Sequence, residues 1–108
     1  MRKKRLERII DQMVQRIVNR FDPERIILFG SAARGDAGPD SDVDLLVVTR
    51  VKGSKREKAV EIGVALNGIP VPMDVVVTTP ENFECRKEVA GTIERPAARE
   101  GRLIYARR

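Results

Sequence analysis

Two aspartates, Asp42 and Asp44, stand at the start of an apolar run that predicts a strand over residues 42–49. Side chains two residues apart on a strand point to the same face, so the two carboxylates are expected to project together. Such a pair is repulsive unless a cation lies between the carboxylates, and hard oxygen ligands suit Mg²⁺ or Mn²⁺. The spacing therefore predicts a divalent-cation site. Taken alone, the pair would equally suit a solvated strand edge or a turn cap.

The Gly30-Ser31 pair follows a short apolar strand expected over residues 25–29. Glycine lets the backbone approach a ligand closely. Backbone amides at the start of a helix favour a phosphate group, and the Ser31 hydroxyl adds a hydrogen-bond donor. An ordinary turn is the alternative. Arg34 either reaches the same phosphates or is a solvated loop charge, and both interpretations stay open.

A third acid, Asp74, lies inside an apolar run that predicts a strand over residues 71–78. A carboxylate in such a run rarely stays buried unless it is paired or bound to a metal. An Arg or Lys from a neighbouring helix is one partner for it. Because the aspartate pair lies on the preceding strand, a third metal ligand is the preferred interpretation. Asp36 and Asp40 are interpreted as turn-forming or solvated acids.

Helices and strands alternate along the chain. Apolar residues spaced three or four apart predict helices over 3–20 and 55–67. Thr79-Pro80-Glu81 predicts the start of a third helix. This helix is expected to continue to about Ile93, with a possible kink, and Pro96 interrupts it. A last strand is expected over 102–105. This order predicts an α/β (α+β) fold, a small mixed sheet with helices packed on it, in a single domain over 1–108.

Composition narrows the function classes. The 108 residues include no histidine, which excludes zinc sites and general bases that depend on histidine. They include a single cysteine, which excludes an internal disulfide. The net charge is +5 with basic residues at both ends, but few aromatic side chains are available to stack on bases, so nucleic acid is not expected as the main ligand. No apolar run is long enough to cross a membrane and no signal-peptide core is evident, so a cytoplasmic location is expected.

The joint motif resembles the minimal nucleotidyltransferase (MNT) family of the DNA polymerase β-like superfamily, whose hallmark is a Gly-Ser pair, ten residues and Asp-x-Asp. Here Gly30-Ser31 is followed by residues 32–41 and then by Asp42-Val43-Asp44. The resemblance implies that Gly30 and Ser31 bind the triphosphate and that Asp42, Asp44 and Asp74 are the catalytic carboxylates, holding two Mg²⁺ ions (or Mn²⁺). Ala32 departs from relatives that carry a larger, often basic residue there.

The implied reaction is transfer of a nucleoside monophosphate from an NTP to a hydroxyl group, with AMP from ATP as the expected case and pyrophosphate as the product. The resemblance extends to MNT antitoxins paired with a helical HEPN-type protein, so a hydroxyl acceptor on such a partner is expected. The alternative is a non-catalytic nucleotide-binding module that neutralises or scaffolds a helical partner by contact. A homodimer or a hetero-oligomer is compatible with either interpretation.

Overall fold

Four strands form one mixed sheet in the order β3-β2-β1-β4. The computed structural model describes residues 2–34 and 42–107, with the backbone alone for residues 2–4 and 34. Strand β1 (Arg25–Phe29) is antiparallel to β2 (Val43–Val48) and to β4 (Arg102–Ala106), whereas β2 is parallel to β3 (Met73–Thr78). The predicted α/β (α+β) fold with a small mixed sheet is therefore confirmed, and β3 lies at one edge.

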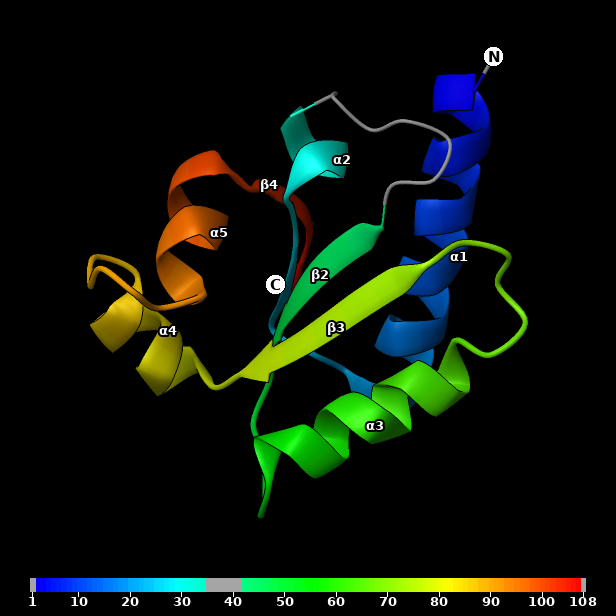
Figure 1. Cartoon of the computed structure of the whole chain (residues 1–108). Coiled ribbons are helices and arrows are strands. Elements are labelled where there is room, and N and C mark those ends of the chain that lie inside the picture. Colours follow the sequence, from blue (N-terminus) through cyan, green and yellow to red (C-terminus); the bar gives the residue numbers. More distant parts are fainter. Residues whose placement is uncertain (1, 35–41, 108) are drawn as a thin grey trace.

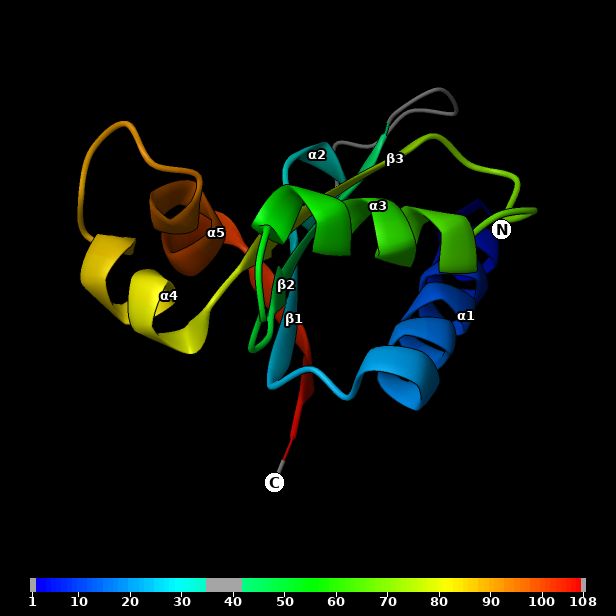
Figure 2. The same ribbon diagram turned by 90° about the horizontal axis from the view of Figure 1, so that it is seen from below.

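Helices cover both faces of this sheet. Helices α1 (Arg2–Phe21) and α3 (Lys55–Ala65) lie on one face, and α4 (Pro80–Arg86) and α5 (Glu94–Glu100) lie on the other (Figures 1 and 2). The short helix α2 (Ser31–Arg34) follows β1 directly. None of the helices in the described part of the chain is long and apolar enough to cross a membrane.

Each face of the sheet has its own apolar core because strand side chains alternate between the faces. The larger core joins α1 and α3 to the sheet and includes Met13, Ile17, Ile26, Leu28 and Ile62, of which none is exposed. The smaller core joins α4 and α5 to the opposite face through Ile27, Phe29, Leu46, Val48, Phe83 and Ala97.

Local sequence signals explain where α1 ends and where α3 begins. Helix α1 ends at Phe21 because Asp22 adopts a positive φ of 47° and Pro23 disfavours a helical residue before it. Helix α3 begins after Ser54, whose hydroxyl accepts a hydrogen bond from the Glu57 amide at 3.2 Å. At its other end, the Arg16 guanidinium of α1 donates to the Asn67 carbonyl at 2.9 Å, which ties the two helices together.

Several predicted boundaries differ from the observed ones; α3, for example, ends at Ala65 rather than at residue 67. The segment after Thr79 forms two helices, and Pro96 lies in the first turn of α5, where the missing N–H breaks no intrahelical hydrogen bond. Strand β3 begins at Met73 rather than at residue 71, after Pro72. Strand β2 begins at Val43, so Asp42 immediately precedes the strand instead of opening it.

Candidate active site

Asp44 and Asp74 are direct neighbours across the parallel pair of β2 and β3. Paired residues of adjacent strands lie about 4.8 Å apart and project from the same face. Asp44 is half-buried because β2 is an inner strand, whereas Asp74 is exposed on edge strand β3. The sequence interpretation of Asp74 as a buried acid is therefore wrong, but its position beside Asp44 agrees with the predicted carboxylate cluster.

The carboxylates lie on the face of the sheet that α4 and α5 partly cover. Strand alternation places Asp44 on the same face as Leu46, and Asp74 on the same face as Val76, and both apolar residues belong to the smaller core. Figure 1 shows α4 and α5 beside this face, with α4 following the end of β3, whereas Asp44 and Asp74 lie near the starts of their strands. The carboxylates thus lie on the same face of the sheet as α5, at the end of the sheet that is next to α2.

Gly30, at the end of β1, is held against the Asp44 carboxylate. Its φ is +73°, a conformation that other residues adopt only with strain. A Cβ atom at this position would collide with Asp44 Oδ2. Ser31 then opens α2, and the Ala33 amide donates to the Gly30 carbonyl at 3.2 Å. The sequence indicated a glycine that admits a ligand, but it missed that the same glycine makes room for a carboxylate.

Burial raises the pKa of Asp44 above its ordinary value, and the negative charges of Asp74 and then Asp42 raise it further. Asp74 and Asp42 therefore both lie close enough to repel the Asp44 carboxylate, although Asp42 is exposed and precedes β2. None of the ion pairs between described residues includes any of the three. A cation placed among them would relieve the repulsion that the raised pKa reports.

These residues fit a divalent cation in donor type and in charge. All three offer hard carboxylate oxygens, which Mg²⁺ and Mn²⁺ prefer. As the side chains stand, no three acidic or cysteine residues within 2–34 and 42–107 are gathered closely enough to hold one ion. An arriving cation would have to draw the carboxylates together.

Three of the residues considered in the sequence analysis lie wholly or partly outside the described residues. The backbone of Arg34 ends α2, but its side chain lies outside the described part of the molecule, as do Asp36 and Asp40. The role of Arg34 in phosphate binding stays a prediction.

Comparisons with known proteins agree with this arrangement. A family model described as a nucleotidyltransferase domain matches residues 6–103. A Methanocaldococcus jannaschii protein named “putative protein adenylyltransferase” is 30% identical over 106 residues, which cover 92% of this chain and 97% of that protein. A second M. jannaschii protein of the same description is 46% identical over 52 residues. That match covers 46% of this chain and only 35% of the longer relative.

Two solved structures share the fold. A crystal structure of a “putative nucleotidyltransferase” from Sulfolobus solfataricus matches 97% of this chain and 84% of its own, with a TM-score of 0.70 and 20% identity. A crystal structure of a toxin-antitoxin with AMP-PNP matches 91% of this chain and 73% of its own, with a TM-score of 0.60 and 18% identity. At 20% and 18% identity, these two structures are evidence for the fold of this chain alone.

Proposed function

The chain belongs to the nucleotidyltransferase domain family, and on that premise we propose that it transfers AMP from ATP to a hydroxyl group on a macromolecular partner. The observation that carries this proposal is the register of β2 and β3, which sets Asp44 beside Asp74, next to the turn at Gly30. Nucleotidyl transfer needs negative ligands for cations beside donors for phosphate. The two groups of residues meet here at one end of the sheet.

Each residue has a proposed role. Asp42, Asp44 and Asp74 are the catalytic carboxylates and would hold Mg²⁺, with two ions expected and Mn²⁺ as a substitute. Held there, a divalent cation would supply positive charge to the α-phosphate and would lower the pKa of the attacking hydroxyl. The Ser31 hydroxyl donates a hydrogen bond to a phosphate oxygen. The absence of a side chain on Gly30 leaves the Asp44 carboxylate in place and lets the backbone lie close to the nucleotide.

The acceptor is proposed to be a helical HEPN-type partner, with this chain as its antitoxin. The likeness of the fold to a toxin-antitoxin solved with AMP-PNP supports this choice, and so do the relatives named as protein adenylyltransferases. The described residues form one sheet with the helices that cover it. The proposal gives none of these helices a role in binding the acceptor, which is a separate protein.

A label-transfer experiment tests the proposal. The chain is incubated with ATP labelled at the α-phosphate, Mg²⁺ and a helical HEPN-type protein. We expect the label to appear on that protein with the wild-type chain and to be lost with the Asp42→Asn/Asp44→Asn variant. Asp11→Asn is the matched control, because Asp11 is an exposed acid on α1. Its label transfer should equal that of the wild type.

The same experiment separates catalysis from simple binding. If no label is transferred by the wild type, and the double variant still relieves the growth inhibition caused by the partner, the chain is a non-catalytic nucleotide-binding module. That outcome would replace the proposal of an adenylyltransferase with that of a protein that neutralises its partner by contact.

A further inference from the structure

Helix α3 carries apolar side chains on the side that faces away from the sheet. Val60 and Val64 are 62% and 68% exposed, whereas Ile62 and Ala65 on the opposite side are buried. Residues four apart share one side of a helix, so the two valines form one patch, called the outer stripe below. A helix that packs only against its own sheet needs apolar residues on one side, so the outer stripe indicates a partner.

Gly63 lies beside the outer stripe in the interior of the same helix. A Cβ atom placed there would have no described atom within 4 Å, and the φ of Gly63 is not left-handed. Neither the packing nor the backbone of the single chain therefore requires glycine, which is unfavourable inside a helix relative to alanine. Because glycine lets another backbone approach closely, this position leaves room for a second helix against the outer stripe.

The charged residues that flank the outer stripe are separated by sign. Because successive helical residues are turned by about 100°, Arg56 falls on one flank of the stripe, and Glu57 and Glu61 fall on the other. All three are exposed. Arg56 takes part in none of the ion pairs between described residues, and the one ion pair of Glu61 among them is with Lys58 of the same helix, at 3.1 Å. A complementary partner therefore presents acids to one flank and a base to the other.

We propose that the outer stripe binds the outer stripe of a second copy of this chain, with the two α3 helices parallel about a two-fold axis. This orientation sets Arg56 of each copy against the acidic flank of the other copy, so both flanks are complementary. An antiparallel pair would bring the two acidic flanks together, which is repulsive. Since one short helix from each copy buries less area than a standard interface, the dissociation constant is expected on the order of 10–100 µM.

This dimer does not cover the candidate active site. Figures 1 and 2 show α3 on the face of the sheet opposite to α4 and α5, and in Figure 2 α3 lies in front of the sheet. Asp44 and Asp74 are on the other face, with Leu46 and Val76 of the smaller core. The inference therefore does not depend on the proposed function and holds whether or not the chain transfers AMP.

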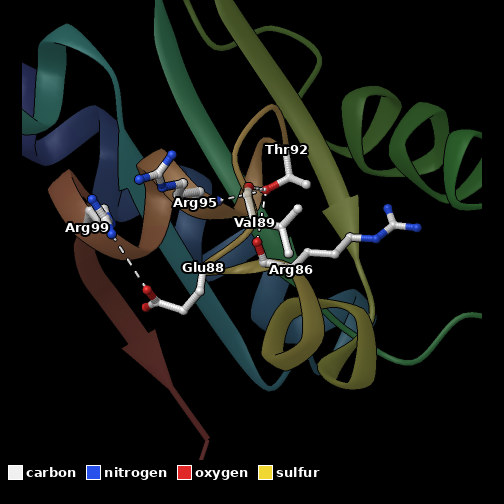
Figure 3. Close-up of polar contacts among 6 residues, drawn as sticks. All are labelled: Arg86, Glu88, Val89, Thr92, Arg95 and Arg99. Atoms are coloured by element: carbon white, nitrogen blue, oxygen red, sulfur yellow. Dashed lines mark hydrogen bonds and ion pairs between the residues drawn. The ribbon is translucent and has the colours of Figure 1, made fainter.

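Sedimentation equilibrium of the whole chain tests the proposal, with circular dichroism to show that each variant is folded. We expect Val64→Glu to weaken self-association at least about tenfold, because it places a charge in the apolar contact. Val89→Glu is the matched control. Val89 is 49% exposed in the turn between α4 and α5, where the Thr92 hydroxyl donates to its backbone carbonyl (Figure 3). This variant should self-associate as the wild type does.

Disulfide cross-linking tests the parallel orientation. In a Cys85→Ser background, Val64→Cys alone should give a cross-linked dimer on oxidation, because position 64 then faces position 64 of the second copy. Val60→Cys alone should do the same. In an antiparallel pair, neither variant would cross-link alone, whereas a mixture of the two would.

Several outcomes would overturn the proposal. A wild-type chain that stays monomeric up to about 1 mM does not use the outer stripe to bind itself. A dimer that Val64→Glu leaves intact is formed by another surface, and cross-linking of the mixture alone would reverse the orientation. If the chain is monomeric but Val64→Glu abolishes its binding to a helical HEPN-type protein, the outer stripe is a surface for that protein instead of a second copy. Should Val64→Glu fail to fold, the cross-linking result decides.

Discussion

Gly30 meets two separate structural requirements at one position. Its backbone is left-handed, and the space where a side chain would start is filled by the Asp44 carboxylate. Gly53 shares only the first requirement, because its φ is +104° but nothing lies within 4 Å of a Cβ placed there. The two glycines therefore allow backbone strain to be separated from displacement of Asp44.

We expect Gly30→Ala to lower the free energy of unfolding by about 1–3 kcal/mol, because an L residue is strained at this φ and its Cβ displaces a carboxylate. Gly53→Ala should show the backbone strain alone. Urea unfolding measures both variants, and ATP affinity should fall for Gly30→Ala only. Equal effects of the two substitutions on stability and on affinity would show that the contact with Asp44 is unimportant.

The raised pKa of Asp44 determines how its charge affects stability. A carboxyl whose folded pKa lies above its unfolded value binds a proton more readily in the folded state. Its contribution to stability is therefore present at low pH and is lost as the pH rises from the ordinary value of 3.8 through the raised folded value. Ionised Asp44 then destabilises the protein at neutral pH when no cation is bound.

Asp44→Asn should consequently melt at a higher temperature than the wild type at pH 7 in EDTA, because it removes a charge repelled by Asp74 and Asp42. The difference should shrink as the pH falls towards 4, and label transfer should drop by at least about 100-fold. Thermal melts between pH 4 and 7 measure the effect. A difference in melting temperature that is independent of pH would rule out the electrostatic explanation.

At the scale of elements, β3 and α5 are joined by a buried polar contact. The Thr78 hydroxyl is the one hydrogen-bond donor to the Glu94 carboxylate among the described residues, at 2.7 Å, and their side chains are 1% and 3% exposed. A carboxylate in this position depends strongly on its donor, since a buried acceptor left unpaired is unfavourable. The contact fixes where α5 crosses the sheet.

Thr78→Val should therefore reduce the free energy of unfolding by about 1–3 kcal/mol, because it keeps the shape of the side chain and removes the donor. Thr78→Ser retains the hydroxyl and is the matched control, which should stay closer to the wild type. Chemical denaturation followed by circular dichroism gives both values. A loss below about 0.5 kcal/mol for Thr78→Val would indicate that another donor replaces the hydroxyl.

The sequence predicted the elements whose signals are local. The apolar spacing in α1 and α3 and the apolar run of β1 lie in short windows of the chain, and the structure forms a helix or strand at each. The break between α4 and α5 was missed because Thr92 stabilises the turn with hydrogen bonds to carbonyls three and six residues away. No pattern of apolar residues reports such a contact.

The candidate site was predicted only as far as residue types and order allow. Alternation along a strand predicts that Asp42 and Asp44 project together, but Asp42 precedes β2. The exposure of Asp74 depends on β3 being an edge strand, which follows from sheet order. The position of α5 against that face depends in turn on the packing of Ala97 and on the contact of Glu94 with Thr78. Both are properties of the tertiary arrangement, and the catalytic roles themselves stay predictions.

For the whole molecule, the family resemblance predicted from the Gly-Ser and Asp-x-Asp spacing is confirmed, and with it the class of enzyme. The chain carries a net charge of +5, yet Asp42, Asp44 and Asp74 all lie at one end of its sheet. A positively charged protein gains nothing from long-range attraction when it binds a cation. On the proposed function, affinity for Mg²⁺ would therefore arise locally, from Asp42, Asp44 and Asp74.

Mg²⁺ should stabilise the folded chain through these residues even without nucleotide. A ligand at ten times its dissociation constant stabilises by about 1.4 kcal/mol, which for a domain of this size raises the melting temperature by roughly 5–10 °C. Thermal melts in EDTA and with increasing Mg²⁺ measure the effect. The shift should vanish in Asp42→Asn/Asp44→Asn and persist in Asp11→Asn. A shift that survives in the double variant would place the cation elsewhere, and its absence in the wild type would mean that the nucleotide brings the metal with it.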